Sequence, residues 1–150
     1  MIRKTKLFAK TASTVAALCL ATPALAVGFE SPSGNILCYT NVFNSGSWTE
    51  AELICLIFEA EWDLPPVYQT GVDSCDLDRT RTIVLPRYGS PELQSTCHGD
   101  IFWPIPMGAI SYGSEWTLPD IRCTMATDGV MCTNSSGHGF TVNRAGQTLF

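Results

Sequence analysis

Apolar and polar positions change character along this chain. A basic start is followed by an uncharged stretch, 11–26, whose most apolar part is 15–21. Beyond it the apolar residues fall into short runs that end at glycine, proline or polar residues, which is typical of strands. The segments expected as strands are 36–40, 80–85, 121–125, 130–134 and 139–143.

Three segments fit this pattern less simply. The run 53–58 is apolar throughout and flanked by glutamate and alanine, so a helix would also suit it. The expected disulfide pairing of Cys55 favours a strand in this run. Residues 29–35 are expected to form a turn. Residues 102–106 hold two prolines, so they form either an edge strand or an extended segment over the core.

The first 26 residues have the features of a cleavable signal peptide. Four basic residues precede the uncharged stretch, which ends in the small-x-small pattern Ala24-Leu25-Ala26. A membrane-spanning helix needs about 20 mostly apolar residues, and no later segment approaches that. We therefore expect residues 27–150 to be a single exported domain, periplasmic or extracellular, without membrane insertion after cleavage.

Loss of that segment would change the charge of the chain. The sequence has nine lysines and arginines against fourteen carboxylates. Four of the nine lie within the first ten residues, so the rest of the chain keeps five arginines, no lysine and a net charge of −9. Such a chain repels nucleic-acid phosphates, is disfavoured at an anionic membrane surface and lacks the amine for Schiff-base chemistry.

The signal segment also contains Cys19, one of seven cysteines, and leaves an even six. Six cysteines in an exported chain are expected to pair, although spacing alone allows fifteen connectivities. The most economical set joins neighbours along the chain: Cys38–Cys55, Cys75–Cys97 and Cys123–Cys132. No C-x-x-C occurs in the sequence, so a metal–thiolate site is not expected.

Turn chemistry supports the last of these pairs. If 126–129 form a four-residue hairpin loop with Gly129 in a left-handed position, Thr124 faces Met131 and Cys123 faces Cys132. Opposed residues on neighbouring strands lie within disulfide reach. The whole pattern predicts a mostly β fold, a small compact antiparallel β domain stapled by three disulfides.

Two stretches resemble a family of small exported bacterial domains of uncharacterised function. One is F-E-S-P-S-G-N-I-L-C at 29–38, and the other is D-G-V-M-C-T-N-S-S-G-H-G-F at 128–140, followed by Arg144. The segment Cys97-His98-Gly99-Asp100 between them also fits. The resemblance implies an exported, cysteine-bonded domain, and it brings no activity or catalytic residue.

The candidate chemistry rests on His98, Asp100 and His138. Two imidazoles and a carboxylate could hold zinc. A hydrolase triad could also be formed by Ser135 or Ser136 together with a histidine and Asp100. No H-E-x-x-H or G-x-S-x-G motif accompanies them. The simpler interpretation is that both histidines sit in glycine-flanked turns and bond to the backbone. We assign no metal site and no cofactor.

The densest aromatic region lies between 101 and 116. Its candidates for a binding surface are Phe102, Trp103, Tyr112 and Trp116. Exposed, such a cluster would mark a partner surface. Buried, it would belong to the core, which takes such residues first.

Two functions follow as hypotheses. The leading one is a non-enzymatic exported domain that presents a loop or aromatic surface to a protein or small ligand. The alternative is a small extracytoplasmic hydrolase that uses His98, Asp100 and His138. The position of the two histidines in the fold distinguishes them.

Overall fold

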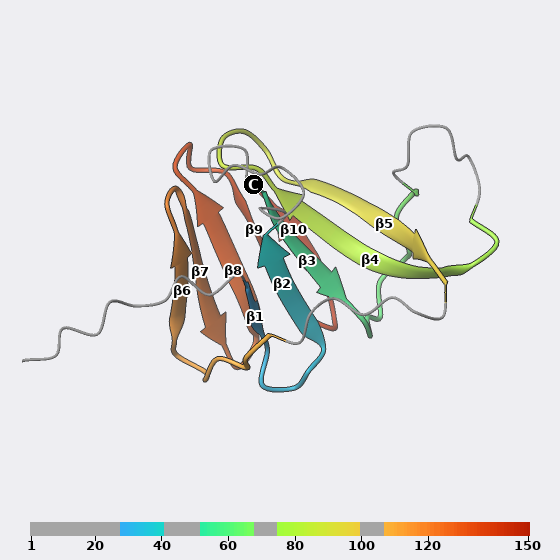
Figure 1. Cartoon of the computed structure of the whole chain (residues 1–150), viewed down its shortest axis with the longest axis horizontal. Helices are drawn as coiled ribbons and strands as arrows, with labels where there is room; N and C mark the ends of the chain where they lie inside the picture. The colour runs from blue at the N-terminus through green and yellow to red at the C-terminus, as the bar shows by residue number, and fades with distance from the viewer. Residues whose placement is uncertain (1–27, 41–51, 68–74, 100–106) are drawn as a thin grey trace, which may run out of the picture.

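The structure, a computed structural model, describes residues 28–40, 52–67, 75–99 and 107–150 (Figure 1). Within these ranges the chain forms strands and no helix, so no described helix could cross a membrane. The strands are β1 Gly28–Glu30, β2 Ile36–Thr40, β3 Leu53–Ile57, β4 Asp78–Leu85, β5 Glu92–His98, β6 Glu115–Leu118, β7 Ile121–Ala126, β8 Gly129–Asn134, β9 Gly139–Val142 and β10 Gln147–Leu149.

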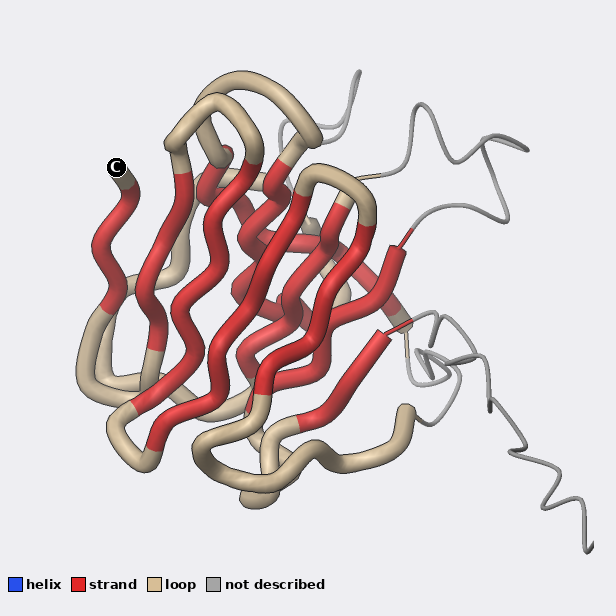
Figure 2. Tube along the Cα trace, turned by 90° about the vertical axis from the view of Figure 1, so that its left-hand side faces the viewer, coloured by secondary structure: helices blue, strands red, loops and turns tan. Residues whose placement is uncertain are grey.

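The strands form two five-stranded antiparallel sheets, each a meander of consecutive strands. Sheet A has the order β1-β2-β3-β4-β5 and sheet B the order β10-β9-β8-β7-β6 (Figures 1 and 2). One hydrophobic core joins the two sheets. The rings of Phe29 in β1 and Trp116 in β6 meet across it, with centroids 5.2 Å apart. The predicted all-β antiparallel fold is confirmed.

Sheet B has one buried and one exposed face. In β7, Ile121, Cys123 and Met125 are buried, whereas Arg122 is exposed and Thr124 half-buried. This alternation follows from the period of two along a strand, which sends successive side chains to opposite faces. It is the pattern of an antiparallel sheet with one side in solvent.

The middle of sheet A is buried on both faces. Cys38, Cys55 and Ile83 point to the core shared with sheet B. Their neighbours Leu37 and Leu56, which face the other way, are only 5% and 0% exposed. This double burial explains why 53–58 is apolar at every position instead of alternating. The segment forms strand β3, not a helix.

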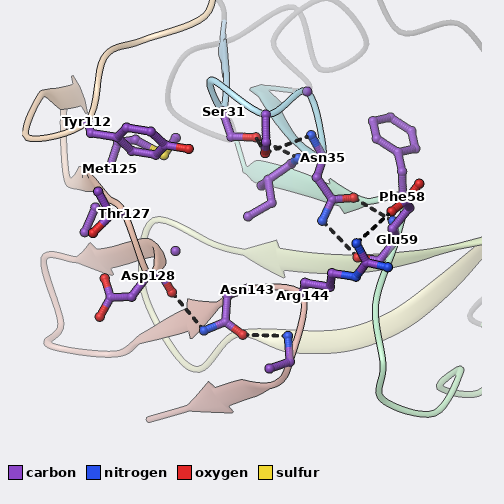
Figure 3. Close-up of a pocket in the computed structure, with 16 residues that line it drawn as sticks. Ser31, Asn35, Phe58, Glu59, Tyr112, Met125, Thr127, Asp128, Asn143 and Arg144 are labelled. Carbon is purple, nitrogen blue, oxygen red and sulfur yellow. Dashed lines mark hydrogen bonds and ion pairs between the residues drawn. The ribbon is translucent and has the colours of Figure 1, made fainter.

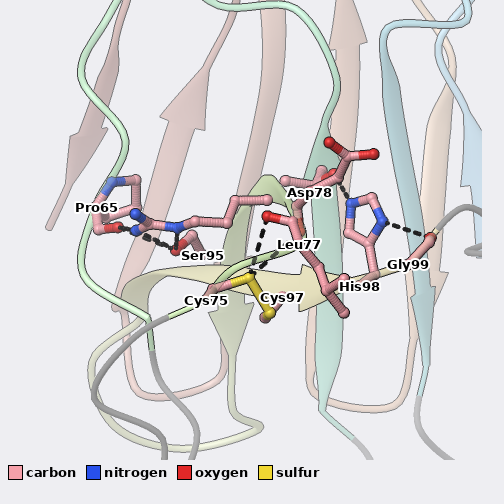
Figure 4. Close-up of a disulfide and its surroundings, with 10 residues drawn as sticks. Pro65, Cys75, Leu77, Asp78, Ser95, Cys97, His98 and Gly99 are labelled. Carbon is pink, nitrogen blue, oxygen red and sulfur yellow. Dashed lines mark hydrogen bonds between the residues drawn. A yellow bond between two sulfur atoms is a disulfide. The ribbon is translucent and has the colours of Figure 1, made fainter.

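The three disulfides join Cys38 to Cys55, Cys75 to Cys97 and Cys123 to Cys132, the pairs that the sequence favours. The first and last connect directly opposed residues of adjacent strands, with Cα atoms 4.0 and 4.1 Å apart, and their cysteines are fully buried. The second ties the segment before β4 to β5, is partly exposed and has a Cα–Cα distance of 5.8 Å (Figure 4).

Several strand predictions match the structure, and others need correction. The expected segments in 36–40, 80–85, 121–125, 130–134 and 139–143 all lie in strands or within one residue of them. The first part of 29–35, expected as a turn, belongs to β1, and β5, β6 and β10 were not predicted. Residues 1–26 and 102–106 lie outside the described residues.

The predicted hairpin register is confirmed, with a tighter loop. Thr124 faces Met131 and Cys123 faces Cys132, but Ala126 and Gly129 also pair. The loop therefore has two residues, not four. Gly129 has a φ of +137°, and a Cβ there would lie 2.4 Å from the carbonyl oxygen of Val142. Only glycine allows β9 to pass so close.

The connections gather at two ends of the sandwich. We call the end with the β1–β2, β7–β8 and β9–β10 turns the groove end, and the end with the β4–β5, β6–β7 and β8–β9 turns the opposite end. Asn134 fastens the opposite end, since its side-chain amide donates to the carbonyl oxygens of Pro86 (2.9 Å) and Gly89 (2.8 Å). Arg87 and Asp120 form an ion pair there, again between the two sheets.

Candidate functional site

The two histidines of the hydrolase hypothesis lie at opposite ends of the molecule. His98 is the last residue of β5, opposite Asp78. Its Nε2 lies 2.7 Å from the Thr80 hydroxyl and its Nδ1 lies 3.2 Å from the Gly99 carbonyl oxygen (Figure 4). Both ring nitrogens therefore have local hydrogen-bond partners.

His138 lies in the β8–β9 turn. Its carbonyl oxygen accepts from the Asn134 amide at 2.9 Å, and its own amide donates to the Asn134 side chain at 3.1 Å. Asn134 is tied to the turn of the β4–β5 hairpin, whereas His98 lies at the other end of that hairpin, opposite Asp78. Six residue steps of about 3.3 Å along β5 separate these ends by roughly 20 Å.

The geometry therefore does not bring the two imidazoles together. Asp100 lies outside the described residues. Ser135 donates to the Asp120 carboxylate at 2.8 Å and Ser136 to the Asn134 side chain at 2.9 Å, so both serines fasten turns. In the described part of the chain, no group of three histidine, cysteine or carboxylate side chains could hold a metal ion.

The aromatic candidates also separate. Trp116 is 6% exposed and packs on Phe29, so it belongs to the core. Tyr112, in the segment before β6, is 49% exposed. Phe102 and Trp103 lie outside the described residues. Of the two that the structure describes, Tyr112 is the one that solvent or a ligand can reach.

Tyr112 stands at the edge of a depression of about 620 Å³, which we call the end groove (Figure 3). It lies at the groove end, between the two sheets. Its walls come from the β1–β2 turn, the residues after β3, the β7–β8 turn and the β9–β10 turn. The lining residues used below are Ser31, Ser33, Asn35, Phe58, Glu59, Tyr112, Met125, Thr127, Asp128, Asn143 and Arg144.

The β1–β2 side of the end groove is held by internal hydrogen bonds. The buried Ser31 hydroxyl accepts from the Ile36 amide at 3.0 Å. Asn35 makes a reciprocal pair with Glu59: its side chain accepts from the Glu59 amide at 2.6 Å and donates to the Glu59 carbonyl oxygen at 2.8 Å. Polar side chains committed in this way keep the wall in one conformation.

The β9–β10 side is fastened in the same manner. Asn143 accepts from the amides of Ala145 and Gly146, at 2.8 and 2.9 Å, and donates to the Asp128 carbonyl oxygen at 2.8 Å. The Trp62 indole donates to the Asn143 carbonyl oxygen at 3.3 Å. The turn is therefore joined both to the β7–β8 turn and to the segment after β3.

Charge in the end groove is partly balanced. The Arg144 guanidinium lies 3.3 Å from the Glu59 carboxylate and 3.6 Å from that of Glu61. Exposed pairs of this kind contribute little stability. They do leave the one guanidinium among the lining residues facing two carboxylates, and Asp128 adds a third acidic group. The groove therefore disfavours anions.

Three polar side chains of the end groove remain for a ligand. The hydroxyls of Tyr112 and Thr127 and the carboxylate of Asp128 make no hydrogen bond within the described part of the chain, and all three residues are exposed (Figure 3). Two hydroxyls both donate and accept, and a carboxylate accepts through two oxygens. The exposed rings of Tyr112 and Phe58 add apolar surface.

The shifted acid–base groups lie elsewhere. Burial raises the pKa of Glu52, just before β3, and the nearby Glu92 carboxylate raises it further. Burial also raises the pKa of Tyr39 in β2. Neither residue lines the end groove.

The sequence contains one signal for this site. The two stretches that resemble a known family, 29–38 and 128–140 with Arg144, lie about a hundred positions apart, and both contribute lining residues to the end groove. The residue types with catalytic or metal-binding chemistry indicated His98 and His138 instead. Ser31 and Asn35 of the first stretch and Asp128 of the second are recognisable as parts of one site only once the fold has brought their turns together.

The chain belongs to a family of unknown function, DUF6636, whose model matches residues 11–150. No curated protein and no solved structure matches the chain.

Proposed function

We propose that this DUF6636 member is an exported ligand-binding domain, and that the end groove takes a small uncharged molecule rich in hydroxyl groups, such as one sugar unit. The observation that carries the proposal is the contrast within the groove. Its walls are fixed by internal hydrogen bonds, whereas the side chains of Tyr112, Thr127 and Asp128 carry polar groups that have no hydrogen-bond partner among the described residues. Binding sites combine a preformed shape with a few convergent polar groups.

The chemistry of the lining favours this ligand class. A sugar offers hydroxyls on its edge and apolar C–H groups on its faces, which match the Asp128 carboxylate and the exposed Tyr112 ring. The carboxylates around Arg144 and the net charge of −9 beyond residue 26 count against phosphate or sulfate ligands. A rigid site also loses little entropy on binding.

Export rests on two further supports. Three disulfides in a small domain fit an oxidising compartment, and the first 26 residues have the composition of a signal peptide. The hydrolase alternative has no comparable support, because its two histidines lie at opposite ends of the sandwich, which the length of β5 separates by roughly 20 Å.

The test is an NMR titration of the secreted, oxidised protein with glucose, galactose and N-acetylglucosamine. We expect amide shifts at the groove end for at least one sugar, and Tyr112→Ala and Asp128→Asn should abolish them. Tyr88→Ala is the matched control, since Tyr88 is also exposed (62%) but lies in the β4–β5 turn at the opposite end. Shifts unaffected by Tyr112→Ala, or no shifts with any of the sugars, would refute the proposal.

A further inference from the structure

The exposed face of sheet B carries a set of threonines. The alternation along β6 to β10 turns their side chains away from the core. None of their hydroxyls makes a hydrogen bond within the described residues. The set consists of Thr117, Thr124, Thr133, Thr141 and Thr148.

Strand register arranges three of them in one row. Thr124 of β7 faces Met131 of β8, Met131 faces Thr141 of β9, and Thr141 faces Thr148 of β10. Neighbouring strands lie about 4.8 Å apart, so the row spans roughly 14 Å. Met131, 46% exposed, places an apolar group between hydroxyls. We call Thr124, Met131, Thr141 and Thr148 the threonine row.

The threonine row lies in a second depression, of about 630 Å³, which adjoins the end groove. All four members of the row line it. The two depressions meet around the β7–β8 and β9–β10 turns. They share the lining residues Ala126, Asp128, Gly129, Asn143 and Ala145. A ligand in the end groove can therefore extend past these two turns into the second depression, on the exposed face of sheet B.

We infer that the ligand is an uncharged oligosaccharide, with one unit in the end groove and the following units along the threonine row. This rests on the proposed function of the end groove. The strand spacing of about 4.8 Å is close to the length of one sugar unit in an extended chain, so successive side chains of the threonine row, Met131 included, meet successive units. The row itself contains no charged residue, which suits a neutral chain.

A length series tests the inference. Calorimetry with cello-, chito- and malto-oligosaccharides of one to six units should show, in one series, affinity rising at least about tenfold from one unit to four and then levelling. The combined variant Thr124→Val, Thr141→Val and Thr148→Val removes the hydroxyls and keeps the β-branched shape. It should remove the gain with length and leave monosaccharide binding unchanged.

The control uses the other threonines of the same face. Thr117 and Thr133 lie opposite Arg122, outside the threonine row, so Thr117→Val with Thr133→Val should leave the length dependence intact. The inference is overturned if affinity does not rise with length, or if both sets of variants lose affinity equally. In either case, monosaccharide binding that depends on Tyr112 would still support the proposed function of the end groove. Absence of binding by every sugar, short or long, overturns both.

Discussion

Asn134 offers the sharpest test of how the two sheets are held together. The residue is 7% exposed and its side chain makes five hydrogen bonds. Two are donated to the carbonyl oxygens of Pro86 and Gly89 in sheet A's β4–β5 turn, and three are accepted from Ser136 and His138 in its own turn. No other described residue spans the two turns with as many bonds. Asn134→Ala should therefore lower stability substantially.

The size of the loss follows from the individual bonds. A neutral hydrogen bond contributes about 1 kcal/mol net, and a buried group left without a partner costs about 1–3 kcal/mol. Water can reach part of this turn, so we expect a loss of about 2–4 kcal/mol in the free energy of unfolding for Asn134→Ala. That is a large share of the ~5–15 kcal/mol typical of a domain, and corresponds to a fall in Tm of roughly 10 °C.

Asn134→Asp separates the donated from the accepted bonds. The aspartate keeps an oxygen for the amides of Ser136 and His138 but loses both donations, and its charge faces two carbonyl oxygens. The variant should be at least as unstable as Asn134→Ala at neutral pH. It should recover partly in acid, because the protonated carboxyl can donate one bond.

The assay is urea denaturation of the oxidised protein, followed by circular dichroism at about pH 7 and at a pH below the ordinary range of carboxyl pKa values. Thr133→Val, a neighbour in the chain whose hydroxyl makes no hydrogen bond within the described residues, is the control and should change stability by no more than about 0.5 kcal/mol. A loss below about 1 kcal/mol for Asn134→Ala would show that these bonds do not hold the sheets together.

Three further outcomes are expected. Mild treatment of the folded protein with dithiothreitol should reduce the Cys75–Cys97 disulfide first, because the other two disulfides are fully buried. Alkylation followed by peptide mapping checks this, and earlier labelling of a buried pair would contradict it. Glu52→Gln should stabilise the protein at neutral pH, because the raised pKa of Glu52 means that the folded state disfavours the ionised carboxylate. Below the ordinary glutamate pKa the carboxyl is protonated in both states, so the gain should disappear there; urea denaturation at both pH values measures it, and an equal gain at both would contradict this reasoning. Asp120→Asn should lower stability by about 1–2 kcal/mol, because it removes the ion pair to Arg87 while an amide oxygen can still accept from Ser135. Thermal melting measures the loss, and an unchanged melting temperature would count against this account.

The strands that could be predicted from the sequence are those whose partners lie nearby or whose apolar residues repeat. The β7–β8 register followed from one short loop and a pair of cysteines. Strand β5 could not be found in this way. Only Leu93 in it packs on the core, and its polar residues are held by β4 through contacts such as the Thr82–Thr96 hydrogen bond of 2.8 Å. Long-range pairing, not local pattern, makes it a strand.

The candidate site was harder to predict for a similar reason. Histidines attract attention because their chemistry is versatile, yet spacing along the chain does not say at which end of a sandwich a turn will lie. The residues of the end groove come from five separate segments of the chain, and several of their side chains also serve the fold, as Asn35 and Asn143 do. Only the arrangement of the strands shows which polar side chains of the groove lack a hydrogen-bond partner within the described residues.

Sheets built from consecutive strands have a consequence for how the chain matures. The six cysteines beyond residue 26 pair first with second, third with fourth and fifth with sixth, so in a chain without the first 26 residues the three bonds can close in the order in which these cysteines leave the ribosome or a translocation channel. An oxidase that joins each new thiol to the previous free one produces the native set without passing through a wrong pairing. Strands β1 to β5 can also assemble before β6 emerges. Correct oxidation of this protein should consequently need a thiol oxidase and no disulfide isomerase.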